Sequence, residues 1–280
     1  MALPLVRVHL SSVDSTNSWA KRSSAQLAPG SLTVVTATEQ TAGRGRGSRA
    51  WASSGGDDIK VTFAFGLARA QVASAYLLSP LLSVTARRAL AARGVAGCQV
   101  KWPNDLILGG CRKVGGILCE LESLQGGGGG EGGAEYLAVL GLGLNVNSLP
   151  EALGVARPAW PLTTLRAEAG GAALDAPALL EALVQHFAAA LPQFLAAGFA
   201  PFRAEYEAAS VLLGRRVRMQ HGEGGGAVEG VATGVAEDGR LLVLEDGAAA
   251  PRGFLSGEVS GLQLAEGDAE MVTGHPGAEQ

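Results

Sequence analysis

The chain has 280 residues, of which 47% are hydrophobic and 17% are charged, and its formal net charge is −4. This length suits one large domain or a large and a small one, and the absence of a basic block argues against a nucleic-acid partner. The three cysteines form no C-x-x-C pair, which indicates reduced thiols that pack as small hydrophobes. We expect neither a signal peptide nor an apolar run of membrane-spanning length, hence no membrane partner and a cytoplasmic location.

The first half of the chain predicts a mixture of strands and helices. Alternating or β-branched residues indicate strands over 6–10, 32–38, 59–65, 99–108, 113–122 and 136–146. The polar run Asp14–Asn17 offers helix N-cap residues, and 74–93 predicts a long helix with Pro80 in its first turns. The glycine-rich segment 125–133 predicts a loop.

The second half changes from helical to strand periodicity. Leucines and phenylalanines keep helical spacing over 174–208, with a break expected at Pro192. Short strands joined by Gly-containing turns follow at 216–219, 227–233, 241–244 and 254–259. They predict a small β-barrel. We therefore expect a large domain over 1–210, the barrel over 211–266 and a disordered tail over 267–280.

A loop of alternating glycine and arginine, Gly43-Arg44-Gly45-Arg46-Gly47, follows the second predicted strand. Glycine lets a backbone approach a ligand closely, and the arginine fork suits carboxylates and phosphates. The loop is typical of a segment that closes over an anion. Taken alone, such a segment is more often a flexible surface loop.

Three further stretches carry polar or glycine residues on predicted strands. In Lys101-Trp102-Pro103-Asn104-Asp105 the proline must end or bulge the strand, Asp105 suits Mg²⁺ and Lys101 a phosphate. The alternative is a β-bulge whose tryptophan packs in the core. Lys113 precedes Gly115-Gly116, which places a cation where a ligand can lie close, unless it faces solvent beside a turn. In Gly141-Leu142-Gly143-Leu144-Asn145 the glycines leave room for a flat ligand or for tight packing.

Together these stretches resemble the biotin protein ligases, in the same order and spacing over about residues 5–265. The resemblance is carried by Ser15-Thr16-Asn17, Gln40, 43–47 with Trp51, 101–105, 113–116 and 141–145. It implies an α+β fold: a mixed sheet with helices packed on one side, followed by a small SH3-like β-barrel. It also implies that MgATP converts biotin to biotinyl-5′-adenylate, and that biotin passes to a lysine of a biotin carboxyl carrier protein.

The resemblance also implies roles for single residues. The biotin site would comprise Ser15, Thr16, Asn17, Gln40, Arg44, Gly45, Arg46, Lys113 and Gly116. The ATP site would comprise Gly43, Arg44, Trp51, Lys101, Trp102, Asn104, Asp105 and Asn145, with Asp105 also binding Mg²⁺. Arg46 and Lys113 would be the catalytic cations, since negative charge develops where a carboxylate attacks a phosphate. A homodimer would fit the family. The family's DNA-binding domain has no match in this sequence, so a repressor role is not expected.

Two residues depart from the family pattern, and three other functions stay open. Asp58 and Lys60 stand where family members often carry an amide and an aromatic residue; Lys60 is expected to reach solvent, and Asp58 to weaken nucleotide binding or help hold metal. A lipoate or octanoate ligase or transferase would share the scaffold, but its usual Arg-Ser-Gly-Gly-Gly loop is absent. A biotin or nucleotide sensor would not need Lys113 and the loop arginines. An interaction module would show no turnover with ATP.

Overall fold

The computed structural model describes residues 2–47, 49–51, 55–124, 134–149, 160–220 and 226–260. The predicted loop 125–133 and the predicted tail 267–280 lie outside these residues. The chain divides into two compact units. Unit 1 comprises Met1–Val211 with Glu237–Gly239, and unit 2 comprises Leu212–Ala236 with Arg240–Gln280.

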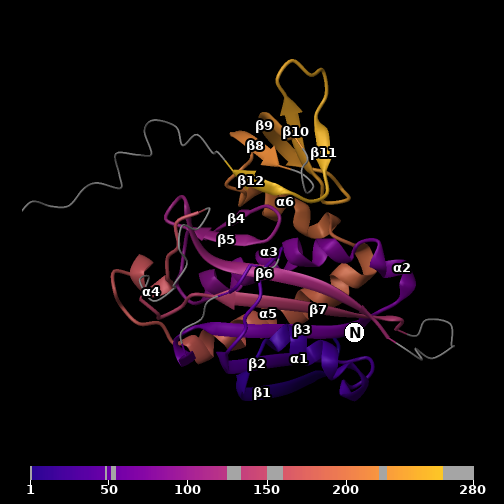
Figure 1. The fold of residues 1–280 in the computed structure, drawn as a ribbon, viewed down its shortest axis with the longest axis vertical. Coiled ribbons are helices and arrows are strands. Elements are labelled where there is room, and N and C mark those ends of the chain that lie inside the picture. The colour runs from indigo at the N-terminus through magenta and orange to yellow at the C-terminus, as the bar shows by residue number, and fades with distance from the viewer. Residues whose placement is uncertain are drawn as a thin grey trace, which may run out of the picture. The chain divides into compact units, whose positions relative to one another are not determined.

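Unit 1 is built on a seven-stranded sheet in the order β1-β2-β3-β7-β6-β5-β4 (Figure 1). Its strands are β1 Leu5–Val13, β2 Leu32–Gln40, β3 Ile59–Leu67, β4 Gln99–Lys101, β5 Asp105–Leu108, β6 Arg112–Ser123 and β7 Tyr136–Leu144. β1 pairs with β2 in parallel, and all other neighbours in this sheet are antiparallel. The sheet is therefore mixed, as predicted.

Six α-helices and three 3₁₀ turns complete the described part of unit 1. The helices are α1 Thr16–Arg22, α2 Arg69–Val72, α3 Leu78–Ala92, α4 Leu165–Glu168, α5 Ala176–Ala197 and α6 Ala200–Ala208. The 3₁₀ turns are η1 Ser24–Gln26, η2 Gly55–Asp57 and η3 Ala75–Leu77. The helix predicted over 74–93 is thus a 3₁₀ turn followed by α3, which is shorter at its start.

The two faces of the sheet are covered differently, because successive side chains of a strand point to opposite faces. On β3, Phe63 and Phe65 pack against Phe187 of α5, with ring centroids 4.5 and 6.3 Å apart. The alternate residue Ala64 packs against Ala20 of α1. The long helices α3 and α5 pack together, so the expected one-sided helix layer exists, while the short α1 covers part of the opposite face.

Helix α5 corrects two sequence-based expectations. It runs through Pro192 without a break, although an internal proline costs a helix about 3 kcal/mol. Burial of Phe187, Leu191 and Phe194 on the helix outweighs that cost. By length and composition α5 is also apolar enough to cross a membrane, contrary to the expectation that no segment would be. Packing of Phe187 against β3, with Leu191 and Phe194 also buried, accounts for part of this apolarity.

The strand predicted over 99–108 is wrong in one respect: it is two antiparallel strands, β4 and β5, that form a hairpin. The Trp102-Pro103 peptide bond is cis and lies in the connection between them. Proline has no N–H to donate to a ladder, so β4 ends before it, as expected of this stretch.

Unit 2 is a five-stranded antiparallel sheet in the order β11-β10-β9-β8-β12. Its strands are β8 Arg216–Gln220, β9 Ala227–Val235, β10 Leu241–Glu245, β11 Arg252–Phe254 and β12 Glu258–Ser260. The strand expected over 254–259 is therefore the end of β11, a turn and β12. At Gly257 a Cβ atom would lie 2.7 Å from the carbonyl oxygen of Gln220, so only glycine fits this turn.

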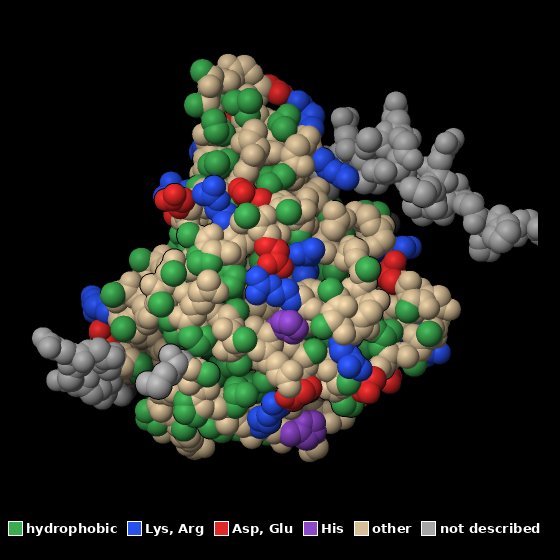
Figure 2. Space-filling model, turned by 180° about the vertical axis from the view of Figure 1, so that it is seen from behind, with side chains coloured by type: hydrophobic (Ala, Val, Ile, Leu, Met, Phe, Trp, Pro, Cys, Tyr) green, Lys and Arg blue, Asp and Glu red, His purple; other side chains and the backbone are tan. Residues whose placement is uncertain are grey.

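The surface seen from behind carries charges of both signs side by side (Figure 2). Some of these neighbouring charges in unit 1 form ion pairs. Arg88 lies 2.6 Å from Glu205, and Arg7 lies 2.9 Å from Glu181. Neither sign of charge gathers into one broad patch on the face that Figure 2 shows.

Candidate active site

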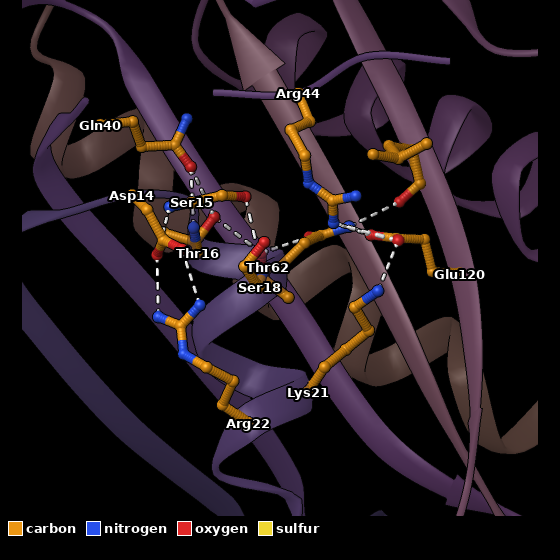
Figure 3. Close-up of polar contacts among 12 residues, drawn as sticks. Asp14, Ser15, Thr16, Ser18, Lys21, Arg22, Gln40, Arg44, Thr62 and Glu120 are labelled. Atoms are coloured by element: carbon orange, nitrogen blue, oxygen red, sulfur yellow. Dashed lines mark hydrogen bonds and ion pairs between the residues drawn. The ribbon is translucent and has the colours of Figure 1, made fainter. Parts of the chain in front are cut away.

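A polar network joins the start of α1 to the centre of the sheet (Figure 3). Ser15 caps α1, since its Oγ accepts from the backbone N–H of Ser18. The backbone N–H and Oγ1 of Thr16 donate to Oε1 of Gln40, at 2.8 and 3.0 Å. Oγ1 of Thr62 lies 2.8 Å from Oγ1 of Thr16 and 2.6 Å from Oδ1 of Asn17. These predicted residues are therefore brought together, and Thr62 joins them.

Gly141 makes room for this network. A Cβ atom at Gly141 would lie 2.5 Å from Oδ1 of Asn17, too close for any side chain. The sequence predicted that glycines on this strand leave space on one of its faces. In the structure, the side-chain amide of Asn17 occupies the space beside Gly141. Nδ2 of Asn17 then donates to the carbonyl oxygen of Leu118 at 3.2 Å.

Glu120 of β6 is a central member of the site that sequence reasoning missed (Figure 3). Its carboxylate accepts from Asn17 Nδ2 at 2.9 Å, from Lys21 Nζ at 2.8 Å and from Arg44 NH2 at 2.8 and 3.0 Å. Partial burial acts to raise the pKa of Glu120, but the hydrogen bonds from Lys21, Asn17 and Arg44 outweigh it and lower the pKa. The available signal was an acidic residue that follows the apolar run Ile117–Cys119 on β6, on the face that carries Gly116.

The glycine–arginine loop leaves the end of β2 and returns at Trp51. The backbone N–H of Trp51 donates to the carbonyl of Gly43 at 2.9 Å, and that of Gly45 donates to the carbonyl of Arg49 at 2.7 Å. A Cβ atom at Gly43 would lie 2.5 Å from the Trp51 carbonyl oxygen, so the closed base of the loop requires glycine. This base positions Arg44 beside Glu120.

The indole of Trp51 fills a slot left by two glycines. A Cβ atom at Gly143 would lie 2.4 Å from its Cε2, and one at Gly116 would lie 3.1 Å from its Cζ3. Nζ of Lys113 lies 5.5 Å from the centre of the indole, within range of a cation–π contact. Three residues assigned by resemblance, Trp51, Lys113 and Gly116, therefore meet on one face.

A second polar group gathers around Asp105. Its carboxylate lies 2.6 Å from Nζ of Lys113 and 3.8 Å from Nζ of Lys101. NH1 of Arg46 donates to Oδ1 of Asn104 at 3.2 Å. Strands β4 and β6 and the glycine–arginine loop thus place three cations, Lys101, Lys113 and Arg46, near the residues expected to bind nucleotide.

Magnesium does not fit Asp105 as a preformed site. Two lysine ammonium groups already face this carboxylate. Within the described residues no group of three or more His, Cys, Asp or Glu side chains could hold a metal. Mg²⁺ usually needs one or two carboxylates plus phosphate oxygens and water, so these residues alone do not supply its ligands.

Two residues expected at the ATP site have buried side chains. The side chain of Trp102 is 2% exposed and belongs to the core. Asn145 is 3% exposed; its Nδ2 donates to the Thr163 carbonyl at 3.1 Å, and its N–H to the Val114 carbonyl at 2.9 Å. Both residues support the strands that carry Lys101 and Lys113.

The two departures from the family pattern are buried as well. Oδ1 of Asp58 accepts from the N–H of Val146 at 2.8 Å and of Ser148 at 3.4 Å, and Oδ2 accepts from the Ser148 hydroxyl. Lys60 does not reach solvent, contrary to expectation: it is 3% exposed, and Nζ donates to the carbonyl of Thr38 at 2.9 Å. Burial lowers the pKa of Lys60, against the raising effect of Asp58, Asp57 and Glu39.

Comparison with known proteins places this fold and site. Residues 10–133 match the model of the biotin/lipoate A/B protein ligase family, and residues 212–261 match the biotin protein ligase C-terminal domain. The biotin–[acetyl-CoA-carboxylase] ligase of Paracoccus denitrificans is 31% identical over 236 residues, which cover 84% of this chain and 92% of the relative. The bifunctional ligase/repressor BirA of Escherichia coli is 30% identical over 254 residues, 91% of this chain and 73% of that protein.

The solved structures agree with the sequence relatives. The biotin protein ligase from Aquifex aeolicus, in complex with biotin and ATP, superposes with a TM-score of 0.71 at 27% identity, covering 92% of this chain and 97% of that one. The match over residues 10–133 places the chain in the wider family of biotin and lipoate protein ligases. With the C-terminal match and the relatives at 30–31% identity, the chain belongs to the biotin protein ligase family.

Proposed function

We propose that the chain is an ATP-dependent biotin ligase that forms biotinyl-5′-adenylate and then biotinylates a lysine of a biotin carboxyl carrier domain. The observation that carries this proposal is the convergence of Arg44, Arg46 and Lys113 on the sheet face that also holds Asn17 and Gln40. Two relatives that are 31% identical to this chain are biotin–[acetyl-CoA-carboxylase] ligases.

The first step joins two anions. A carboxylate oxygen of biotin attacks the α-phosphorus of ATP, the bond to the bridging oxygen breaks, and pyrophosphate leaves. Repulsion between the reactants is the main obstacle, and fixed cations aimed at the reacting atoms lower it. In the proposal, Lys113 and Arg46 act at the junction of the two reactants. This is supported by the position of Lys113 between Asp105 and Trp51 and of Arg46 beside Asn104.

The second step transfers the acyl group. The acceptor lysine amine attacks the acyl carbon, AMP leaves with the bonding electrons, and the amine loses its extra proton to solvent. The mixed anhydride is sensitive to water, so a loop that closes over it is needed. Gly43 to Trp51 takes this role in the proposal, since the base of that loop is already fixed by backbone hydrogen bonds.

Mg²⁺ enters the proposal with the triphosphate of ATP, whose oxygens would supply most of its ligands. Two lysines already pair with Asp105, the carboxylate expected to bind the metal, so no step is assigned to Mg²⁺. A cytoplasmic location and a homodimer also remain proposals that follow from the family.

The test is exchange of labelled pyrophosphate into ATP, measured with biotin and, in parallel, with lipoate and octanoate. Exchange with biotin alone is the expected result. Exchange only with lipoate or octanoate would contradict the substrate and keep the fold. Absence of exchange with all three would contradict the proposed enzymatic activity. Transfer is then followed as biotin incorporation into a purified carrier domain, with its acceptor lysine replaced by arginine as the control.

A further inference from the structure

One carboxylate links the two sides of the candidate site, and the proposed reaction gives it no role. Glu120 accepts from Asn17 of α1 and from Arg44 of the glycine–arginine loop, while standing on β6 itself (Figure 3). Its side chain is 18% exposed, against 41% for Arg44. The half-exposed guanidinium of Arg44 is thus held by the largely buried carboxylate of Glu120.

The contact uses only part of the Arg44 guanidinium. Both hydrogen bonds to Glu120 come from NH2. Within the described residues, no acceptor is found for Nε or NH1 of Arg44. A guanidinium held at one nitrogen keeps donors for a second, planar anion, because its five N–H groups form a rigid fork. Glu120 therefore holds Arg44 and leaves it able to receive a ligand.

The charges favour addition of an anion over replacement of Glu120. One carboxylate faces two cations, Lys21 and Arg44, so the cluster carries a formal charge of +1. A ligand carboxylate beside Arg44 would neutralise it without breaking either ion pair. The same carboxylate fixes Nδ2 of Asn17, which leaves Oδ1 of that amide to its contact with Thr62.

We propose that Glu120 is a positioning residue, which holds Arg44 and Asn17 in the arrangement that receives the biotin carboxylate and the biotin ring system. This inference rests on the proposed function, because it takes biotin as the ligand. Glu120 acts through Arg44 and Asn17 and touches no reacting atom. Biotin affinity should therefore depend on Glu120.

The first experiment compares Glu120→Gln with Glu122→Gln in the full-length protein. Glu122 is exposed, lies two residues further along β6, and gives a control for loss of one negative charge. Isothermal titration should show biotin binding weakened about tenfold or more by Glu120→Gln, as expected for a lost charge-assisted contact. Biotin binding by Glu122→Gln should stay within about twofold of wild type. Unchanged or tighter biotin binding by Glu120→Gln would overturn the proposal; tighter binding would mean that biotin displaces Glu120.

A second variant tests the contact between Glu120 and Arg44 without changing a residue of the sheet. In Arg44→Lys the single ammonium would pair with Glu120 and keep no planar fork for the ligand. The variant should remain folded in a thermal unfolding scan and lose biotin affinity to a similar extent as Glu120→Gln. Combining both changes should cost less than the product of the single losses, because both act on one contact. Wild-type affinity in Arg44→Lys, or a full product in the double variant, would refute the inference.

Failure of the inference and failure of the proposed function give different results. If wild type bound no biotin, the proposed function would be wrong. If wild type bound biotin and Glu120→Gln bound it equally well, only the role of Glu120 would be wrong. Amide hydrogen exchange over 43–47 in ligand-free Glu120→Gln gives a readout that needs no ligand: these amides should exchange faster than in Glu122→Gln. Equal exchange would contradict the anchoring of the loop.

Discussion

Lys113 contacts both Asp105 and the ring of Trp51 in the candidate site. Its ammonium pairs with Asp105 and lies over the Trp51 indole. Replacing it with alanine should lower the rate of adenylate formation by more than tenfold, because a cation facing the reacting anions is lost. Single-turnover pyrophosphate release measures this rate. Lys113→Arg keeps the charge and should lose less; a wild-type rate in Lys113→Ala would remove the residue from the catalytic set.

Lys60 should make stability depend on pH. Burial lowers its pKa in the folded protein below the ordinary value of 10.5. Between these two values the unfolded chain binds more protons than the folded one, so stability rises with pH and falls as pH decreases through the folded-state pKa. Lys60→Met removes this titration. Urea unfolding from pH 7 to pH 10 should show wild type gaining stability relative to Lys60→Met, and a constant difference between them would contradict the effect of burial.

At the scale of elements, one buried carboxylate defines the turn after β7. Asp58 accepts two backbone N–H groups and a hydroxyl from the segment 146–148. Asp58→Ala would leave these donors unsatisfied and should lower the free energy of unfolding by about 1–3 kcal/mol. The matched control is Asp57→Ala, because Asp57 is an exposed neighbour. Equal urea midpoints for the two variants would show that the turn does not depend on Asp58.

Helix α6 carries a polar group that the fold does not satisfy. Within the described residues the hydroxyl of Tyr206 is buried and has no hydrogen-bond partner, and burial raises its pKa. The ring itself is well packed, 5.8 Å from that of Phe199. Tyr206→Phe should therefore be as stable as wild type or more stable, by up to about 1 kcal/mol. A loss of stability in thermal unfolding would mean that the hydroxyl has a bound water as its partner.

The local sequence pattern predicted most helices and strands, but it did not predict the tertiary contacts of several residues. The strands and the capped start of α1 follow from alternation and from Ser15, which act over a few residues. Glu120 could not be predicted as part of the site, because its partners Arg44 and Asn17 lie 76 and 103 residues away in the sequence. The burial of Lys60 depends on the two strands that flank β3, and the continuity of α5 through Pro192 depends on packing. Tertiary contacts decided each of these cases.

At the scale of the whole molecule, the residues assigned to biotin and ATP all belong to unit 1. A ligand that binds only the folded state stabilises by about 2.7 kcal/mol at a hundred times its Kd. In differential scanning calorimetry, biotin with ATP should therefore raise the unfolding temperature of unit 1 and leave that of unit 2 in place. A single transition that shifts as a whole would instead show that the two units unfold cooperatively.

The long sequence separations within the site set the order in which the nascent chain gains its function. Asn17 and Arg44 emerge early in synthesis, but their shared anchor is 103 residues beyond the first of them. β6 is itself enclosed only when β7 pairs with it and with β3. Contacts between such distant residues form slowly, because the intervening chain must first be ordered. The ability to bind ligand is thus acquired late. In an incomplete chain that ends before β7, β6 lacks its partner strand, and Glu120 is not yet fixed in the position from which it orients Arg44.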